Sequence, residues 1–405
     1  MAVKKQEKVI NLEKDNFMYK LGIFNNISEK GIGKFTSPHF SLSKEDLDTD
    51  AVIVRSHDLN GIEFNSRVKA IGRAGAGVNN IPVSRCTEKG IVVFNTPGAN
   101  ANAVKELVLS GLFLTARNIV DGVEFVKSLK GSEPTDFKTN VEKNKSRFKG
   151  TEIKGKTLGV IGLGAIGTMV ANSGLSLEMN VVGFDPFITV KNAWGLGNSV
   201  KRASSLDELL SSSDFISIHM PLTEGTQGII NKETLSKVKS SAVFLNFSRD
   251  GIINEIDILT ALDSGGLRSY VTDFGSSELV KNKNVVCLPH LGASTMEAED
   301  NCAIMISNQI KSYLEDGNII NSVNFPACFM ERAGKVRLAI MNKNVPNMVS
   351  QITAVLAKED LNIQGMMNKS RGEIAYNIVD LGNSPSDSLI EDIKSVDGIL
   401  FLRVL

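Results

Sequence analysis

The segment Lys156–Gly167, with the sequence KTLGVIGLGAIG, decides the fold of this 405-residue chain. It begins with apolar and β-branched residues, which are typical of a buried strand, and it ends in the pattern Gly-x-Gly-x-x-Gly. In a dinucleotide-binding unit the first glycine forms a tight turn, the second lets a pyrophosphate approach the backbone, and the third lets the next helix pack on the strand. The glycines at these three positions are Gly162, Gly164 and Gly167.

A second apolar segment follows at the distance that this motif requires. Residues 180–184 predict a short strand, and Asp185 comes directly after it, 18 residues beyond Gly167. An acid at this place bonds to the ribose hydroxyls and repels a 2′-phosphate, so the sequence favours NAD over NADP. The glycine pattern alone also occurs in simple glycine-rich turns. The strand before it, the helix after it and Asp185 together favour the dinucleotide site.

Length and composition limit the class of protein. A chain of 405 residues predicts two or three domains, and 42% hydrophobic residues suffice for ordinary cores. Lys plus Arg and Asp plus Glu both number 45, so no net charge attracts nucleic acid or an acidic membrane. We find no apolar run near the ~20 residues of a membrane span, and the N-terminus lacks the apolar region of a signal peptide. Four scattered cysteines predict reduced thiols in a cytoplasmic protein, without a disulfide framework or a metal site: Cys86, Cys287, Cys302 and Cys328.

Strand and helix signals alternate along most of the chain, which predicts parallel α/β domains. Residues 1–18 are polar and are expected to form a loose extension, whereas residues 128–152 are expected to cross between domains. Ligands of open α/β sheets bind beyond the carboxyl ends of the strands, where this sequence places polar and glycine-rich residues. The expected strands are 19–24, 51–54, 68–73, 91–95, 215–219, 242–246, 270–274 and 285–288, and long helices are expected over 101–119 and 295–314.

The last segment, residues 336–405, reads as a separate small unit after the linker candidate at 321–326. Its signals follow the order β-α-β-β-α-β, which is typical of a ferredoxin-like fold. The expected elements are strands at 336–340, 363–367, 374–379 and 399–404, and helices at 348–357 and 386–393.

Hydride transfer from a secondary alcohol needs a base for the hydroxyl proton and a cation for the substrate carboxylate and carbonyl. Of the four histidines, His290 is the best candidate base, because it follows the end of a predicted strand at the mouth of the crevice. Arg249, at the end of another strand, is either the cation or a surface arginine in a turn. Glu278 could bond to the far nitrogen of His290 and raise its pKa, or could be an exposed acid.

Four residues of the N-terminal part are candidates for binding substrate. Ala76 and Gly77 offer successive backbone N–H groups that could hold a carboxylate, and the alternative is a tight turn. Arg55 and Arg73, both at strand ends, could bind an anionic group such as a phosphate, and the alternative is that each is a solvated arginine.

Several motifs extend along nearly the whole chain and together resemble one enzyme family. The chain resembles the D-isomer-specific 2-hydroxyacid dehydrogenases that carry a C-terminal ACT domain, from about Tyr19 to Leu405. The segments that carry this resemblance are Gly72–Val78 (GRAGAGV), Asn95–Val104 (NTPGANANAV), Gly155–Gly162 (GKTLGVIG), Asn246–Arg249 (NFSR) and Leu288–Thr295 (LPHLGAST).

The resemblance implies two Rossmann-like parallel-sheet domains followed by a ferredoxin-like ACT domain. Residues 1–105 and 294–325 would form the substrate domain, 106–293 the NAD domain, and 330–405 the regulatory domain. It implies a catalytic triad of Arg249, Glu278 and His290. Although the chain reads Asp273-Phe274-Gly275-Ser276-Ser277-Glu278 without the usual Glu-Pro, the spacing from Asp273 still reaches Glu278. The implied cofactor contacts are Ala165, Ile166, Asp185, Phe247, Ser248, Asp273, Leu291, Gly292 and Ala293, and the implied substrate-side positions are Arg55 and Asn100.

The resemblance also implies an activity. We expect NAD-dependent oxidation of 3-phospho-D-glycerate to 3-phosphohydroxypyruvate, the first step of L-serine synthesis. The alternatives are another D-2-hydroxyacid, such as glycerate or 2-hydroxyglutarate, or a non-catalytic regulator that senses NAD and amino acids. The implied partners are further copies of this chain, in a homodimer or homotetramer, with no nucleic acid and no membrane. L-serine is the expected effector, at Asn342, Asn344 and Asn362, although Asn342 and Asn347 replace the His and Gly of the usual pattern.

Overall fold

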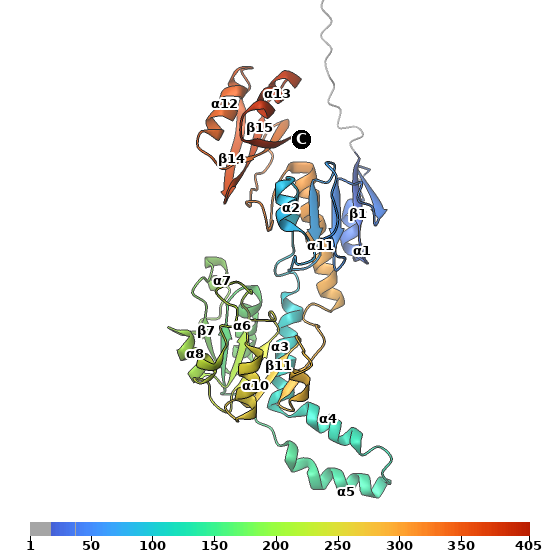
Figure 1. Cartoon of the computed structure of the whole chain (residues 1–405), viewed down its shortest axis with the longest axis vertical. Coiled ribbons are helices and arrows are strands. Elements are labelled where there is room, and N and C mark those ends of the chain that lie inside the picture. The colour runs from blue at the N-terminus through green and yellow to red at the C-terminus, as the bar shows by residue number, and fades with distance from the viewer. Residues whose placement is uncertain (1–17, 37) are drawn as a thin grey trace, which may run out of the picture. The chain divides into compact units, whose positions relative to one another are not determined.

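The computed structural model describes residues 18–36 and 38–405. The chain folds into two compact units (Figure 1), a first unit of Met1–Ala99 with Glu299–Leu405 and a second unit of Asn100–Ala298. Along the sequence, the second unit is therefore inserted into the first. The extension predicted for residues 1–18 lies outside the described residues apart from Met18. The three domains expected from the sequence have different boundaries from these two units, and those boundaries remain a prediction.

The N-terminal part of the first unit is a parallel sheet of five strands in the order β2-β1-β3-β4-β5. Strand β3 is buried along its whole length, as expected for a strand covered on both faces. The sequence analysis did not identify β2, an edge strand of sequence FSLSK. The strands are β1 (Tyr19–Ile23), β2 (Phe40–Lys44), β3 (Ala51–Val54), β4 (Ala70–Arg73) and β5 (Val92–Phe94), and the helices are α1 (Glu29–Ile32), η1 (Gly33–Phe35), α2 (Val83–Glu88) and α11 (Met296–Asp316), which begins in the second unit.

The second unit is built on a parallel sheet of seven strands in the order β12-β11-β10-β9-β6-β7-β8. Strand order reverses at β6, so the carboxyl ends of β6 and β9 border the crevice in which ligands of such sheets bind. Alternate side chains enter opposite cores: Val243 and Leu245 of β10 pack with α3 and α6, whereas Phe244 packs with α8 and α10. The strands are β6 (Thr157–Ile161), β7 (Asn180–Phe184), β8 (Lys201–Arg202), β9 (Phe215–Ile218), β10 (Val243–Asn246), β11 (Ser269–Thr272) and β12 (Val285–Cys287). The helices are α3 (Ala101–Ala116), α4 (Ile119–Ser128), α5 (Pro134–Asn144), η2 (Lys145–Phe148), α6 (Ala165–Ser176), α7 (Val190–Trp194), α8 (Leu206–Ser212), α9 (Lys232–Leu235), α10 (Glu255–Asp263) and η3 (Leu279–Lys281).

Helices α4 and α5 form a hairpin that projects from the end of α3 (Figure 1). The long helix predicted to reach residue 119 ends at Ala116, because Asn118 adopts a left-handed conformation (φ 48°) between α3 and α4. Neither α4 nor α5 has a fully buried residue. The segment predicted as a polar crossing is thus partly helical. It is held by the rings of Phe125 and Phe148, 5.2 Å apart, with Arg147 over both.

The C-terminal part of the first unit has the predicted β-α-β-β-α-β order, and its four strands form an antiparallel sheet in the order β14-β15-β13-β16. This is a ferredoxin-like fold, so the predicted fold class is confirmed. The two helices cover one face of the sheet, and the other face shares a core with the N-terminal sheet and α11. The elements are β13 (Val336–Lys343), α12 (Met348–Ala357), β14 (Ile363–Arg371), β15 (Ile374–Leu381), α13 (Asp387–Ser395) and β16 (Ile399–Val404).

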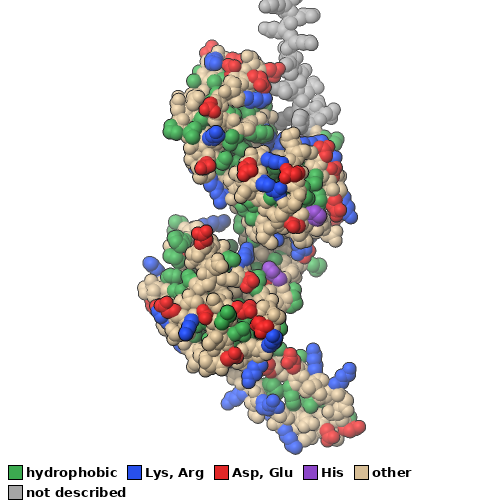
Figure 2. Space-filling model, viewed as in Figure 1, with side chains coloured by type: hydrophobic (Ala, Val, Ile, Leu, Met, Phe, Trp, Pro, Cys, Tyr) green, Lys and Arg blue, Asp and Glu red, His purple; other side chains and the backbone are tan. Residues whose placement is uncertain are grey.

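The surface carries charges of both signs. On the face shown in Figure 2, acidic and basic side chains are interspersed, in keeping with the equal numbers of each in the sequence. Within residues 18–36 and 38–405, none of the helices has both the length and the apolar composition that crossing a bilayer requires. In the same part of the chain, the structure groups no three His, Cys, Asp or Glu side chains that could hold a metal ion.

Candidate active site

The glycine turn after β6 has the geometry of a dinucleotide-binding loop. Gly162 has φ +87°, and a Cβ atom there would lie 2.6 Å from the carbonyl oxygen of His219. A Cβ at Gly167 would lie 1.9 Å from the carbonyl oxygen of Gly162, so neither glycine can be replaced without moving the backbone. At Gly164, the N-cap of α6, a Cβ would meet nothing within 4 Å, and no described side chain caps this helix end. Open space beside uncapped N–H groups fits a pyrophosphate. Ala165 and Ile166, which are predicted to contact the cofactor, are the first two residues of this helix.

Asp185 lies at the end of β7 in a pocket of about 320 Å³. Its two carboxylate oxygens accept hydrogen bonds from the backbone N–H groups of Leu163 and Phe187, both at 2.8 Å. These bonds tie the acid to the glycine turn and fix its direction. The pocket combines apolar walls with this carboxylate, which suits the adenine and ribose of a dinucleotide. Its lining residues are Leu163, Gly183, Asp185, Pro186, Ile188, Leu196, Val200, Lys201 and Arg202.

Asp273, at the end of β11, presents a buried oxygen that lacks a partner. The residue is 3% exposed, and its Oδ2 accepts a hydrogen bond from the N–H of Gly292 at 3.0 Å. Its Oδ1 is buried and has no partner among the described residues. Burial raises the pKa of Asp273 above its usual value. An unpaired buried acceptor costs free energy unless a ligand donates to it, and the carboxamide of a nicotinamide is such a donor. The residues present therefore fit NAD.

The other predicted cofactor residues lie on two loops, Phe247 and Ser248 after β10 and Leu291, Gly292 and Ala293 after β12. Phe247 is buried against α3, where a Cβ on Gly111 would contact its ring. Ser248 donates its hydroxyl to the carbonyl of Met220 at 2.5 Å, so it joins the loops after β9 and β10. Leu291 is 42% exposed, whereas the neighbouring Gly292 is buried.

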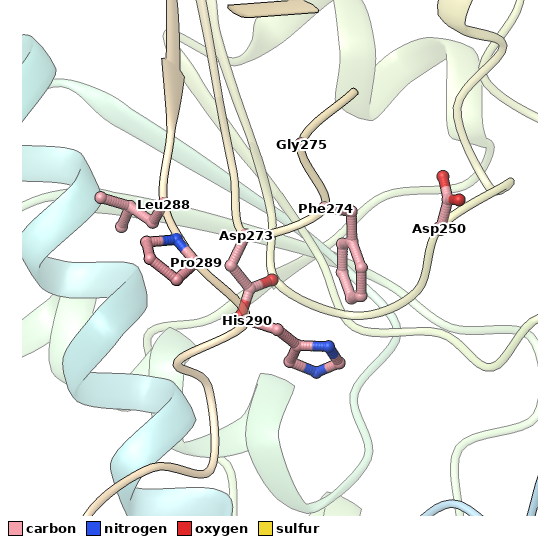
Figure 3. A pocket seen from close by; sticks show the side chains of 7 residues that line it. All are labelled: Asp250, Asp273, Phe274, Gly275, Leu288, Pro289 and His290. Atoms are coloured by element: carbon pink, nitrogen blue, oxygen red, sulfur yellow. The ribbon is translucent and has the colours of Figure 1, made fainter. Parts of the chain in front are cut away.

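His290 opens into a pocket of about 460 Å³ at the ends of β10, β11 and β12. In Figure 3 its imidazole lies beside the carboxylate of Asp273 and the ring of Phe274, whose centroid is 5.0 Å away at an angle of 69°. The charge of His290 lowers the pKa of Asp273, although burial outweighs this effect. Within the described chain, the side chain of His290 makes no hydrogen bond or ion pair, so both ring nitrogens are open to a ligand. The pocket is lined by Asp250, Asp273, Phe274, Gly275, Leu288, Pro289 and His290.

The other two members of the predicted triad lie on exposed loops of the same unit. Arg249 donates to the carbonyl of the preceding Ser248 at 2.6 Å. Glu278 bonds to Lys281 at 2.6 Å, and this hydrogen bond holds the pKa of Glu278 below its usual value. In the described structure no bond joins Glu278 to His290. The structure therefore brings His290 together with Asp273, and the triad remains a prediction.

In the first unit, the loop after β4 is shaped for binding an anion. The carbonyls of Gly75, Ala76 and Gly77 accept bonds from Thr96 N–H (3.0 Å), Asn95 Nδ2 (2.6 Å) and Arg73 Nη1 (2.8 Å), respectively. In a trans peptide the N–H group points away from the carbonyl, so the N–H groups of residues 76–78 point out of the loop. No acceptor for these N–H groups occurs in the described residues. Successive free N–H groups form a nest for a carboxylate.

The two predicted anion-binding arginines have different surroundings. Arg73 donates to the carbonyls of Arg55 (3.1 Å) and Gly77 (2.8 Å), so it supports the loop. Arg55 is half exposed and forms an ion pair with Glu299 at 2.8 Å. Asn100 is the N-cap residue of α3, and its side chain does not cap that helix.

The predicted effector residues lie on the C-terminal sheet and its loops. Asn342 is 1% exposed, and its amide bonds to Asn377 (2.7 Å) and to the carbonyl of Lys343 (2.6 Å). Asn344 donates to Gly372 at 2.9 Å, and Asn362 is exposed. The side chain of Asn342 is thus committed to the protein interior, and the effector site remains a prediction.

Sequence reasoning missed two residues that shape the first unit. Asn25 has φ 65°, and its Oδ1 accepts bonds from the N–H groups of Ser56 (2.9 Å) and His57 (2.8 Å), which fixes the loop that carries Arg55. Glu299 pairs with Arg55 across 244 positions of sequence. For Asn25, the local signal was an asparagine close to the end of a strand. For Glu299 there was none, because a pairing between distant residues leaves no pattern in a single sequence.

Comparison with known proteins gives one consistent family. The family model described as "D-isomer specific 2-hydroxyacid dehydrogenase, NAD binding domain" matches residues 111–292. A D-3-phosphoglycerate dehydrogenase of Methanocaldococcus jannaschii is 36% identical over 326 residues, which are 77% of this chain and 60% of that protein. A D-3-phosphoglycerate dehydrogenase of Haemophilus influenzae is 31% identical over 357 residues, which are 85% of this chain and 83% of that protein.

A solved structure agrees with these sequence relatives. The crystal structure of NAD⁺-bound 3-phosphoglycerate dehydrogenase of Entamoeba histolytica has a TM-score of 0.59 and 26% identity, and the match covers 76% of this chain and 99% of that one. The chain spans 60% of the Methanocaldococcus relative and only 51–55% of the relatives from Synechocystis, Bacillus subtilis and Archaeoglobus fulgidus.

Proposed function

Because the chain belongs to the D-isomer specific 2-hydroxyacid dehydrogenase family, whose NAD-binding domain it carries, we propose that it oxidises 3-phospho-D-glycerate to 3-phosphohydroxypyruvate. One observation carries the proposal: the unbonded imidazole of His290 lies beside the buried Asp273 in a pocket of about 460 Å³. The same unit contains the dinucleotide turn. The names of the relatives supply the substrate, and this reaction is the first step of L-serine synthesis.

Each group of the reaction has a partner in the chain. When bound, NAD supplies the hydride acceptor. A ring nitrogen of His290 takes the proton of the substrate hydroxyl, since histidine titrates nearest to neutral pH. Asp273 Oδ1 would accept a hydrogen bond from the carboxamide of the nicotinamide and so orient that ring. Arg249 polarises the carbonyl that forms, once its guanidinium leaves the carbonyl of Ser248.

The first unit contains further residues that are predicted to bind the anionic groups of a substrate. The free N–H groups of residues 76–78 bind the carboxylate. Arg55 binds the phosphate, because guanidinium donors match phosphate oxygens, and the phosphate must compete with Glu299. Arg73 supports the loop through its bonds to the carbonyls of Arg55 and Gly77, and its role as a second phosphate-binding residue stays a prediction. Glu278 supports His290 only if its carboxylate leaves Lys281.

We also propose a homo-oligomer in the cytoplasm. Ile119, Val123 and Val126 of α4 are 41–46% exposed and lie at helical positions i, i+4 and i+7, so they form one apolar face on the projecting hairpin. A second copy of the chain would cover this face in a dimer. Light scattering that gives the mass of one chain, 43.8 kDa, would contradict the dimer.

We also propose regulation by L-serine at the ferredoxin-like unit, where Asn344 and Asn362 are exposed and Asn342 is buried. Serine should then slow the reaction at saturating NAD. A rate that serine leaves unchanged would remove this part of the proposal.

The first experiment measures NADH oxidation with 3-phosphohydroxypyruvate, hydroxypyruvate, pyruvate and 2-oxoglutarate, for the wild type and His290→Gln. We expect turnover of the phosphorylated acid and a loss of about 10²- to 10⁴-fold in the variant, the usual contribution of a general acid or base. NADH binding should be retained, which separates loss of catalysis from loss of folding. Preferential turnover of an unphosphorylated acid would contradict the assigned substrate. Tight NADH binding without any turnover would favour a non-catalytic regulator.

A further inference from the structure

The pocket that contains Asp185 also contains two cations that an NAD site does not require. Lys201 and Arg202 form strand β8, and both line the pocket that holds Asp185. Both are exposed, and neither forms an ion pair or a side-chain hydrogen bond within residues 18–36 and 38–405. The charged groups that line this pocket are therefore one carboxylate and two cations.

The sheet register places these cations beside the ribose end of the pocket. Strands β7 and β8 are parallel neighbours, with Val182 opposite Lys201 and Gly183 opposite Arg202. Asp185 follows two residues after Gly183, so Arg202 lies on the adjoining strand near the same carboxyl end. In dinucleotide-binding sheets an acid here bonds to the ribose 2′-hydroxyl of NAD, while a nearby arginine accommodates the 2′-phosphate of NADP. This pocket contains both the acid, Asp185, and a nearby arginine, Arg202.

We propose that Lys201 and Arg202 form a 2′-phosphate subsite, so that NADP binds with only a modest penalty and Asp185 alone sets the preference for NAD. The carboxylate of Asp185 repels a 2′-phosphate, and the two cations attract it. The backbone bonds from Leu163 and Phe187 hold Asp185 in place, so the acid cannot swing away from the phosphate. This inference concerns the dinucleotide site and does not rest on the proposed substrate.

The test uses ligands that differ only in the phosphate and needs no turnover. Adenosine 5′-monophosphate and adenosine 2′,5′-bisphosphate compete with bound NADH, whose fluorescence reports displacement. For the wild type we expect the bisphosphate to bind within about tenfold of the monophosphate. In the double variant Lys201→Gln/Arg202→Gln, bisphosphate affinity should fall roughly tenfold, as expected for two exposed ion pairs, while monophosphate affinity stays within about twofold.

Two further variants complete the test. Lys191→Gln removes an exposed lysine of α7 that does not line the pocket, and it should leave both affinities unchanged. Asp185→Asn removes the charge and keeps an oxygen that can accept one of the two backbone hydrogen bonds, so bisphosphate affinity should rise about fivefold or more. Equal weakening of both ligands in the double variant would overturn the inference. The inference would also be overturned if Asp185→Asn showed no detectable binding of the bisphosphate. Retained NADH binding would show that this variant is folded.

Discussion

Arg337 and Asp380 form a fully buried ion pair between β13 and β15. Two bonds join them, at 2.6 and 2.8 Å, and both side chains are 0% exposed. Burial alone would raise the pKa of Asp380, but Arg337 and the N–H of Ala333 outweigh it and lower the pKa. Because the folded-state pKa is depressed, this stabilisation is present above the unfolded pKa and is lost as the pH falls through the folded pKa.

Removing one partner of this pair should destabilise the first unit strongly. Asp380→Asn leaves the guanidinium of Arg337 buried without a counter-charge, and we expect a loss of about 3–5 kcal/mol in the free energy of unfolding. Urea unfolding at pH 7 measures this loss. The control is Asp392→Asn, since Asp392 forms an exposed ion pair with Lys358 and should change stability by no more than about 1 kcal/mol. Equal effects of the two variants would show that burial of the pair is unimportant.

His219 should make the second unit sensitive to acid. Burial lowers its pKa to about 3, and its Nε2 lies 2.8 Å from the hydroxyl of Ser217. The unfolded chain binds a proton near pH 6.5 and the folded chain only near pH 3, so stability is lost as the pH falls from about 6.5 towards 3. At pH 5 this effect amounts to about 2 kcal/mol.

Urea unfolding at pH 8 and pH 5 tests this effect in the wild type and in His219→Gln, which does not titrate. The variant should lose about 2 kcal/mol less than the wild type between the two pH values. If both proteins lose the same free energy, His219 is not the group that responds to acid.

Some site residues could be predicted from local sequence patterns. Others could not, because their roles depend on contacts between residues that are distant in sequence. Gly162, Gly167 and Asp185 follow from a turn and two strands that are close in sequence, and the backbone shows why glycine is needed at both positions. The partner of Glu278 did not follow, because an exposed carboxylate can bond to a lysine three residues away as well as to a distant histidine. The unpaired Oδ1 of Asp273 has no sequence signal, because its burial depends on tertiary packing.

At the scale of elements, the contact between β6 and α6 can be tested with two helical glycines. A Cβ at Gly167 would lie 1.9 Å from the carbonyl oxygen of Gly162, whereas one at Gly122 in α4 would meet nothing within 4 Å. Gly167→Ala should displace the turn, weaken NADH binding tenfold or more and cost about 1–3 kcal/mol of stability. Gly122→Ala should leave NADH binding unchanged and add up to about 1 kcal/mol. NADH fluorescence titration and thermal unfolding measure both, and similar NADH affinities would contradict the assigned role of the turn.

The elements that the sequence did not predict are those with little core to bury. Helix α5 begins with Pro134 at its first turn and has no buried residue, so it lacks the apolar periodicity by which a helix is identified. Strand β8 has only two residues, and β2 lies at a sheet edge. The buried strands and the ferredoxin-like order were predictable because apolar runs, turns and spacing all agreed.

The division of the chain into two units predicts two steps of thermal unfolding. NADH binds the glycine turn of the second unit and should stabilise that unit alone. At 100 times the dissociation constant, the added stability is about 2.7 kcal/mol, which corresponds to a rise of roughly 5–10 °C in the transition of a unit of this size. Calorimetry with and without NADH checks this. A single transition that moves as a whole would show that the units unfold together.

The first unit should unfold as one body, because its C-terminal sheet bonds to the end of α11. Arg403 is 7% exposed and donates to the carbonyls of Tyr313 (3.1 Å) and Leu314 (2.6 Å), while the hydroxyl of Tyr376 donates to Gly317 at 2.7 Å. The last carbonyls of a helix have no partner within the helix, and those of Tyr313 and Leu314 also accept bonds from the N–H of Gly317 (3.0 Å) and the hydroxyl of Tyr19 (2.7 Å). The C-terminal sheet is thereby part of the same core as α11.

Arg403→Met retains most of the apolar volume but removes two charged donors, so the carbonyl of Tyr313 keeps only the N–H of Gly317 and that of Leu314 only the hydroxyl of Tyr19. We expect a loss of about 1–3 kcal/mol, seen by calorimetry as a lower midpoint of the transition that NADH does not shift. The N-terminal and C-terminal sheets should still unfold in that same step, since the apolar core that they share is unchanged. If the variant instead shows an additional transition for the C-terminal sheet alone, then the hydrogen bonds of Arg403, rather than the shared core, are what make the first unit cooperative.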